Sequence, residues 1–262
     1  MTAIDPSNSG TFDDRDVAAC YAHRPPYPPE LYHFLLDLVP DRSRALDLGC
    51  GPGKIARALG GHFGHVDAVD PAIAMIEAGR RQAGTLTNIG WLATTAEDAP
   101  LAGPYDLVTA GASIHWMKHE VVFPRLAEQL HQQGVVAIVS GDNVLRAPWL
   151  EDWQAFVSDW LNRVGRTPDE QGFAAALRSY EPWMDIEGNR DFDFPFTQDL
   201  RSFVECQHSR ATWARSWLGS LSTGFDADLT ERLAPYALDG KISYEVRTTL
   251  TWGKPRAEPR RA

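Results

Sequence analysis

The chain has 262 residues, of which 44% are hydrophobic and 23% are charged, a balance typical of a globular protein. Its length allows one large α/β domain or one domain with a sizeable insertion. A net charge of −10 argues against nucleic acid as the main ligand, because phosphate neutralisation needs clustered Lys and Arg. The sequence contains no run of about 18 apolar residues, so it predicts no membrane span.

Residues 1–10 are predicted to be disordered and lack the basic and apolar regions of a signal peptide. The cysteines Cys20, Cys50 and Cys206 are scattered, which fits reduced thiols in a cytoplasmic protein. Neither the cysteines nor the histidines show metal-binding spacing, so no metal site is predicted. The basic residues at 254–261 are expected to belong to a frayed terminus.

Strands and helices alternate along the first 140 residues, which predicts a parallel sheet covered on both faces. The predicted strands cover 44–48, 65–69, 88–92, 105–110 and 134–139. The predicted helices cover 11–23, 30–39, 54–59, a segment after Pro71, and a segment kinked at Pro124 that runs to Gln133. Between the first two helices, the prolines of residues 24–29 require an extended backbone.

After Ser140 the chain becomes mainly helical, and six of its nine tryptophans lie between residues 149 and 217. Strands are predicted near 187–195 and over 242–252. We therefore expect a core with an N-terminal cover over 1–140, a tryptophan-rich helical lid over 141–240, and a last core strand with a tail over 241–262. Most of the lid tryptophans are expected to form its own core, with one or two facing the substrate.

Residues 44–54 combine a short apolar strand, the glycines Gly49, Gly51 and Gly53, and a helix that starts at Lys54. Glycines let a ligand lie against bare backbone, and a helix start adds N–H donors, so the stretch predicts a nucleotide-like cofactor site. The dinucleotide fingerprint would need glycine at position 54, and a phosphate loop would need Ser or Thr after Lys54. Asp47 lies inside the buried strand and needs partners: a cationic ligand, or backbone N–H groups and waters.

The segment Leu46-Asp-Leu-Gly-Cys-Gly-Pro-Gly53 resembles the first motif of the class I S-adenosylmethionine-dependent methyltransferases. Residues 21–28, 70–71, 96–98 and 114–116 also resemble the small-molecule branch of this superfamily. The Ile114-His-Trp116 segment and the long insertion are most similar to the trans-aconitate methyltransferase group. The resemblance implies a Rossmann-like, seven-stranded, mostly parallel sheet with a C-terminal antiparallel hairpin and a helical lid. The implied cofactor is S-adenosylmethionine, which leaves as S-adenosylhomocysteine.

The resemblance also implies which residues bind the cofactor. Asp70 and Pro71 would lie at the ribose, although Asp70 could instead be a helix N-cap with Pro71 as the first helical residue. Glu97 and Asp98 would lie at the adenine amino group, although Asp98 could be a solvated loop residue.

Asp47, Gly49, Gly51 and Gly53 would surround the methionine part of the cofactor. Tyr21 and Arg24 would form an N-terminal cover in which Arg24 pairs with the cofactor carboxylate, unless it is a surface residue. Trp116 would lie against the adenine or in the substrate wall, or in an ordinary core.

Methyl transfer from a sulfonium is an in-line displacement that needs alignment and, for a protonated nucleophile, a general base. His115 is the candidate base because it follows the strand over 105–110, at the edge where ligands bind in open α/β sheets. It could equally pack against the cofactor. Aromatic lid residues favour an apolar or planar substrate; Arg210 and Arg215 could bind a substrate carboxylate or be solvated.

Two other functions stay open at this point. The chain could be an S-adenosylmethionine-binding enzyme with other chemistry, such as a cyclase, because cofactor residues and reacting residues are separate. It could also be a non-catalytic partner protein that binds the cofactor.

Overall fold

The structure is a computed structural model that describes residues 11–166 and 170–260, so the predicted disorder of residues 1–10 lies outside the described residues. The chain divides into two compact units. We call the first the core unit, which comprises Tyr27–Gly141, Ala176–Phe192 and Thr248–Ala262. We call the second the helical unit, which comprises Met1–Pro26, Asp142–Ala175 and Asp193–Arg247.

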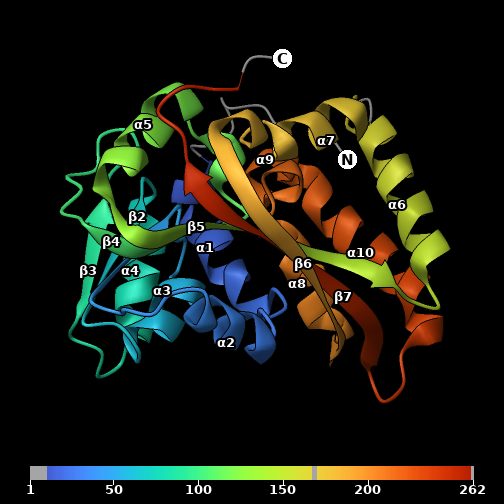
Figure 1. Cartoon of the computed structure of the whole chain (residues 1–262). Coiled ribbons are helices and arrows are strands. Elements are labelled where there is room, and N and C mark those ends of the chain that lie inside the picture. The colour runs from blue at the N-terminus through green and yellow to red at the C-terminus, as the bar shows by residue number, and fades with distance from the viewer. Residues whose placement is uncertain (1–10, 167–169, 261–262) are drawn as a thin grey trace. The chain divides into compact units, whose positions relative to one another are not determined.

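The strands form one seven-stranded sheet in the order β3-β2-β1-β4-β5-β7-β6 (Figure 1). The strands are β1 (Arg44–Leu48), β2 (His65–Asp70), β3 (Ile89–Ala93), β4 (Tyr105–Gly111), β5 (Leu130–Arg146), β6 (Met184–Asp199) and β7 (Lys241–Pro255). The pairs β3-β2, β2-β1, β1-β4 and β4-β5 are parallel, and the C-terminal strands are antiparallel. The Rossmann-like α/β fold predicted from the sequence is therefore confirmed.

Helices join these strands. The core unit contains α2 (Pro29–Asp37), α3 (Lys54–Gly60), α4 (Ile73–Gln82), η3 (Ile114–Trp116), α5 (His119–Gln129) and η4 (Glu181–Trp183). The helical unit contains α1 (Arg15–Cys20), η2 (Tyr21–His23), α6 (Leu150–Arg163), α8 (Leu200–His208), η5 (Ala211–Trp213), α9 (Arg215–Leu218), η6 (Gly219–Leu221), α10 (Ser222–Leu233) and η7 (Ala234–Tyr236). The boundary between the units falls within α7 (Glu170–Arg178).

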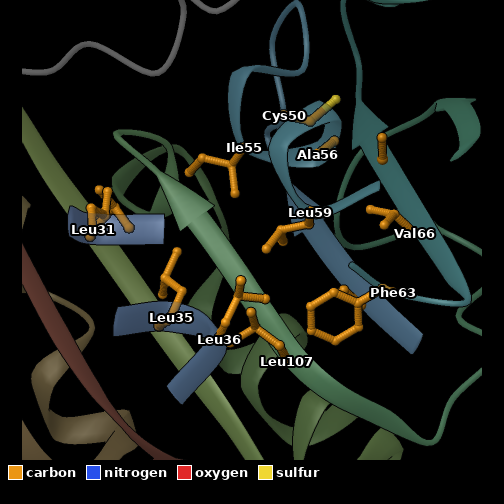
Figure 2. Packing of buried hydrophobic residues seen from close by; sticks show 14 of the residues in the cluster. Leu31, Leu35, Leu36, Cys50, Ile55, Ala56, Leu59, Phe63, Val66 and Leu107 are labelled. Atoms are coloured by element: carbon orange, nitrogen blue, oxygen red, sulfur yellow. The ribbon is translucent and has the colours of Figure 1, made fainter. Parts of the chain in front are cut away.

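Neighbouring strand residues point to opposite faces of the sheet. The apolar strands of the core unit therefore present two apolar faces, and helices pack on both of them. Figure 2 shows one face, where side chains of α2, α3 and β4, among them Leu35, Leu59 and Leu107, belong to one apolar cluster. On the other face, Leu46 and its neighbours pack with α5. Two apolar layers of this kind hold the carboxyl ends of β1, β2 and β4 in fixed positions.

The junction of α5 and β5 differs from the prediction. The helix ends at Gln129 rather than Gln133, and β5 begins at Leu130, where it pairs with Tyr105 before the register shifts. Gly134 allows this irregularity, because a Cβ at that position would lie 2.5 Å from the Tyr105 carbonyl oxygen. The strand also continues to Arg146, so residues 141–146, expected in the lid, are strand.

The basic C-terminal segment is not frayed over residues 254–260, which corrects the prediction. Lys254 Nζ donates a hydrogen bond to the carbonyl oxygen of Gln132 at 3.1 Å. Arg256 and Arg260 both pair with Asp185 at the start of β6, at 2.8 and 2.9 Å. These long-range partners are invisible in a local reading of the sequence.

The helical unit has one aromatic core. Trp149 and Trp160 are each 1% exposed, and Trp153 packs partly buried against the same cluster, as predicted. The side chains of Arg210 and Arg215 are not simply solvated, because they lie 3.2 Å from Asp142 and 2.9 Å from Glu205 respectively. Of the described residues, none lies in a helix long and apolar enough to cross a membrane.

Candidate cofactor site at the carboxyl edge of the sheet

The glycine turn between β1 and α3 has a backbone that other residues rarely adopt. Gly49, Gly51 and Gly53 have φ values of 62°, 54° and 75°. There is also no space for a side chain at two of these positions. A Cβ on Gly49 would lie 2.4 Å from Cβ of Ser113, and one on Gly53 would lie 2.3 Å from the Trp91 ring. Both conformation and packing therefore require glycine at positions 49 and 53.

Asp70 ends β2 and holds the glycine turn. Its Oδ2 accepts a hydrogen bond from the Gly51 N–H at 2.8 Å, and its Oδ1 accepts one from the Ala72 N–H at 2.9 Å. Because α4 begins only at Ile73 and Pro71 is exposed, Asp70 is not an N-cap followed by a helical proline. Each carboxylate oxygen can accept more than one hydrogen bond, so the group can also receive two hydroxyls of a ligand.

Asp47 obtains its partners from the protein. The Thr109 hydroxyl donates to Oδ1 at 2.8 Å, and the Ala56 N–H in the first turn of α3 donates to Oδ2 at 3.0 Å. Burial raises the pKa of Asp47 to about 7, the two hydrogen bonds oppose that shift, and the charge of Asp70 adds to it. The sequence suggested either a cationic ligand or backbone donors, and the structure provides one backbone donor and one hydroxyl.

The loop after β3 is tied to α5. Glu97 Oε1 accepts a hydrogen bond from the Lys118 N–H at 2.7 Å. The Arg125 guanidinium donates to the carbonyl oxygens of Ala96, Glu97 and Ala99. Arg125 was missed in the sequence because an arginine within a helix carries no local sign that it reaches a loop about 28 residues earlier.

Asp98 lies in the same loop and is exposed. The Thr95 hydroxyl donates to its Oδ2 at 2.9 Å, and the Asp98 N–H donates to that hydroxyl at 3.2 Å. This local turn orients the carboxylate without burying it. Its predicted role at the adenine amino group stays a prediction.

The loop after β4 is strained and closely packed. Ala112 has a φ of 52°, which is uncommon for a residue with a Cβ. The Ser113 hydroxyl donates to the Leu48 carbonyl oxygen at 2.6 Å, so the loop is joined to the end of β1. Serine is so common in loops that nothing in the sequence distinguished Ser113.

His115 lies in η3, half-buried, with its ring 5.2 Å from the Trp116 ring. Within the part of the chain that the structure describes, its imidazole makes no hydrogen bond. Burial, and to a lesser extent nearby His119, lowers the pKa of His115 to about 4. The imidazole is therefore neutral at pH 7 and able to accept a proton.

Tyr27 also belongs to this region. It lies within residues 21–28, but the resemblance implied no site role for it. A Cβ on Gly111, the last residue of β4, would lie 3.0 Å from the Tyr27 hydroxyl and 2.8 Å from Ile55. The extended proline segment thus brings a phenol to the carboxyl end of β4. The only signal in the sequence was its position between two prolines.

Tyr21 and Arg24 lie in the helical unit, whereas the glycine turn lies in the core unit. The Arg24 guanidinium stacks 4.1 Å from the centre of the Tyr21 ring, and its Nε donates to the Ser209 hydroxyl at 2.7 Å. It also lies 3.4 Å from Asp142, so Arg24 is not a bare surface residue. Their proposed function as a cofactor cover stays a prediction.

Cys50 fills space beneath the glycine turn. It is buried, and burial raises its thiol pKa well above the ordinary value, which makes it a poor nucleophile. Cys20 and Cys206 are also buried, and neither forms a disulfide bond. Within residues 11–166 and 170–260, no group of three or more His, Cys, Asp or Glu could hold a metal ion.

Comparison with known proteins points to methyltransferases. Residues 45–134 match the family model described as a methyltransferase domain. A trans-aconitate 2-methyltransferase of Delftia acidovorans is 36% identical over 106 residues, which are 37% of this chain and 38% of that protein. An uncharacterized methyltransferase of Mycobacterium bovis is 32% identical over 137 residues, which are 52% of this chain and 54% of that protein. The chain thus spans about half or less of the length of these relatives.

A solved methyltransferase structure from Anaeromyxobacter dehalogenans superimposes with a TM-score of 0.67 and 22% identity, covering 90% of this chain and 99% of that one. At that identity the likeness concerns the fold, and it extends over both units. The sequence likeness, in contrast, is centred on the glycine turn. Residues 45–134 therefore match a methyltransferase domain, and the chain is similar to the class I S-adenosylmethionine-dependent methyltransferases and, within them, to the trans-aconitate methyltransferase group.

Proposed function

We propose that the protein binds S-adenosylmethionine at the carboxyl ends of β1, β2 and β4 and transfers its methyl group to a small molecule. The observation that carries the proposal is Asp70, which is fixed by the N–H groups of Gly51 and Ala72 beside a glycine turn. This arrangement places a carboxylate next to a backbone without side chains, which suits a ribose diol and the chain attached to it.

The residues of the site fit the parts of the cofactor. Asp70 would accept the ribose hydroxyls, and the loop held by Arg125 would present Asp98 to the adenine amino group. Asp47 and the glycine turn would face the methionine part, where the ionised form of Asp47 favours an ammonium group.

When bound, the cofactor supplies a methyl group on a sulfonium, which is already activated for displacement. The protein then has to align the acceptor and exclude water. If the acceptor is protonated, neutral His115 would take its proton at a ring nitrogen, and the low pKa keeps that nitrogen available above about pH 4. The depressed pKa also makes His115 a weak base, which suits an acceptor that loses its proton as the new bond forms.

Binding and transfer can be tested separately. Calorimetry should show that S-adenosylmethionine and S-adenosylhomocysteine each bind with a stoichiometry of one. The absence of heat with both compounds would reject the proposal. Incubation with methyl-labelled cofactor and a metabolite extract should then yield a methylated small molecule. If the cofactor binds and the product is cyclised but carries no label, the alternative of a cyclase holds. If the cofactor binds and no product forms, the protein is a non-catalytic binder.

His115 provides a sharper test of the chemistry. Replacing it with Ala should reduce turnover by about 10²-fold or more if it is the base, with the dissociation constant of S-adenosylhomocysteine unchanged. His119, whose ring nitrogen lies 2.9 Å from the Ile114 carbonyl oxygen, is the matched control. His119→Gln should affect stability more than turnover. Equal effects on turnover would assign His115 a packing role.

A further inference from the structure

Asp47 is a buried carboxyl group without a cationic partner in the described chain. It is 1% exposed, and its hydrogen-bond donors among the described residues are the Thr109 hydroxyl and the Ala56 N–H. The nearest charge that acts on it is the carboxylate of Asp70, which has the same sign. A buried charge without a counter-ion is costly, so the group must either hold a proton or receive a cation from a ligand.

The Thr109 hydroxyl has two acceptors. Its oxygen lies 2.8 Å from Asp47 Oδ1 and 3.4 Å from the Leu46 carbonyl oxygen, and the side chain is fully buried. A hydroxyl carries a single proton, which it rotates toward one acceptor at a time. Thr109 can therefore donate to Asp47 or to Leu46.

Both forms of Asp47 are served by this hydroxyl. When Asp47 is ionised, Thr109 donates to Oδ1. When Asp47 is protonated, its O–H donates to the Thr109 oxygen, and Thr109 turns its own proton to the Leu46 carbonyl. The Ala56 N–H donates to Oδ2 in both cases, so the change of charge needs no movement of heavy atoms. The bond from Thr109 to Asp47 is the shorter one, so the hydroxyl favours the ionised form.

We propose that Thr109 is a positioning residue that couples the binding of a cationic ligand group to the release of one proton from Asp47. The cation is the ammonium group of the proposed cofactor, so this inference rests on the proposed function. As the cation binds, the O–H bond of the Asp47 carboxyl breaks, the proton passes to solvent, and the Thr109 hydroxyl turns from Leu46 to the carboxylate. An opposite charge within about 4–6 Å favours the ionised form roughly tenfold to a thousandfold.

The charged neighbours of Asp47 define the pH range of this coupling. Burial raises the pKa of Asp47 to about 7, and the charge of Asp70 at the end of β2 adds to that rise. Burial also raises the pKa of Cys50, in the glycine turn, well above the ordinary value of a thiol. The coupling should therefore be visible between pH 6 and 8, where the Cys50 thiol keeps its proton.

Two helices also face this group. From α2, the hydroxyl of Tyr32 feels the charge of Asp47, and burial raises its pKa to about 12, so it stays protonated in this range. From α3, Ala56 contributes its N–H, and the charge of Arg57 acts on Tyr32. Proton release in this range should therefore come from Asp47.

Calorimetry of the full chain tests the coupling. S-adenosylhomocysteine is titrated at pH 6 and pH 8, in two buffers of different ionisation enthalpy at each pH, because the difference in heat counts the protons released. The wild type should release about 0.4–0.9 proton per ligand at pH 6 and about 0.1 at pH 8, and should bind about five- to tenfold more weakly at pH 6. Under the same conditions 5′-methylthioadenosine, which keeps the ribose and adenine but lacks the ammonium group, should release no proton.

Matched variants separate the hydroxyl from packing. Thr109→Val removes the hydroxyl and keeps the bulk, so Asp47 should hold its proton to higher pH and the release at pH 8 should rise to about 0.4 proton. Thr109→Ser keeps the hydroxyl and should give the wild-type values. Thr248→Val removes another buried hydroxyl of the core unit, which donates to the Gly141 carbonyl oxygen, and should change nothing. Asp47→Asn should abolish the release.

Urea unfolding of the free protein tests the effect of Thr109 without any ligand. The wild type should lose stability as pH rises to about 7, because the folded state holds the Asp47 proton more tightly than the unfolded chain. In Thr109→Val this loss should continue for about one further pH unit, and in Thr109→Ser it should not. If Thr109→Val does not fold, Thr109→Ala takes its place with the same expectation.

Three results would overturn this inference alone: S-adenosylhomocysteine binds at pH 6 without proton release, 5′-methylthioadenosine releases as many protons, or Thr109→Val and Thr109→Ser have the same pH profile. Release that persists in Asp47→Asn would assign the proton to another group and also overturn it. If neither ligand binds at either pH, the proposed function is rejected, and the unfolding curves still decide whether Thr109 controls the charge of Asp47.

Discussion

The two units use buried polar groups in opposite ways. At the carboxyl edge of the core unit, Asp47, Asp70 and Ser113 all bond to the protein itself. In the helical unit, the buried atoms Trp149 Nε1 and Gln207 Oε1 have no hydrogen-bond partner among the described residues. The first region is therefore held in its geometry before a ligand arrives, whereas the second has hydrogen bonds still to gain.

This difference suggests that the two units contribute in different ways to ligand binding. Under the proposed function, the cofactor would be recognised by a turn whose shape is enforced by backbone conformation and internal hydrogen bonds. The following changes test the contrast, from the largest expected effect to the smallest.

Gly53→Ala should destabilise the fold by about 4 kcal/mol, because it combines a left-handed backbone with overlap on the Trp91 ring, 2.3 Å from the added Cβ. Gly240→Ala in the helical unit is the control, since its φ is 74° but nothing lies within 4 Å of an added Cβ. It should cost only about 1–2 kcal/mol. Urea unfolding measures both; equal losses would mean that the core turn is not enforced by packing.

Asp47→Asn should remove a dependence of stability on pH. Because burial raises the folded pKa to about 7 from the ordinary aspartate value of 3.8, the folded state holds this proton more tightly. The wild type should therefore lose stability, on the order of a few kcal/mol, as pH rises from about 4 to 7, and then level off. The variant should lack that slope in urea unfolding between pH 4.5 and 8. An unchanged slope would show that Asp47 titrates normally.

Asp70→Ala should weaken S-adenosylhomocysteine binding about tenfold or more, because it removes the carboxylate beside the glycine turn. Asp106 is a matched control in the same unit, since its Oδ2 also accepts two backbone N–H groups, from Ser43 and Arg44 at 2.8 and 3.0 Å. Asp106→Ala should cost comparable stability with no loss of affinity in the folded protein. Calorimetry with unfolding curves decides; equal losses of affinity would remove Asp70 from the ribose.

Ala112→Gly should stabilise the protein by about 0.5 kcal/mol, since relief of the left-handed backbone outweighs the extra chain entropy of glycine. Asp239 in the helical unit has a similar φ of 51°. Aspartate tolerates this region better than alanine, so Asp239→Gly should gain less or lose stability. Thermal unfolding compares the two, and a larger gain at position 239 would contradict the assignment of strain to the loop after β4.

What the sequence could predict was local. The strand over 44–48 and the glycine turn depend on neighbouring residues, and both lie where they were expected. The start of β5 was wrong because the shift in register at Gly134 depends on Tyr105, about 30 residues earlier. The links made by Arg125 and by Arg256 were missed for the same reason: each joins segments far apart in the chain.

The candidate site divides in the same way. Asp70 and His115 follow strand ends and could be found from the pattern of strands. The aromatic core of the helical unit could not, because Trp149, Phe203 and Tyr244 come from three separate segments that meet only in the fold. Arg210 was considered for a carboxylate, but only the structure shows that it lies 3.2 Å from Asp142.

The indole of Trp91 restricts the order in which substitutions at positions 79 and 91 can be accepted. It occupies the space that a Cβ would need at Gly53 and also at Gly79 in α4, where the distance would be 2.3 Å. Gly79 has an ordinary helical backbone, and the indole supplies the nearest atoms that an added Cβ would meet there. A lineage that exchanged Trp91 for a smaller residue could then place alanine at 79 and gain helix propensity, whereas the reverse order passes through a clash. The glycine at 53 would persist on either route, because its backbone conformation still demands it.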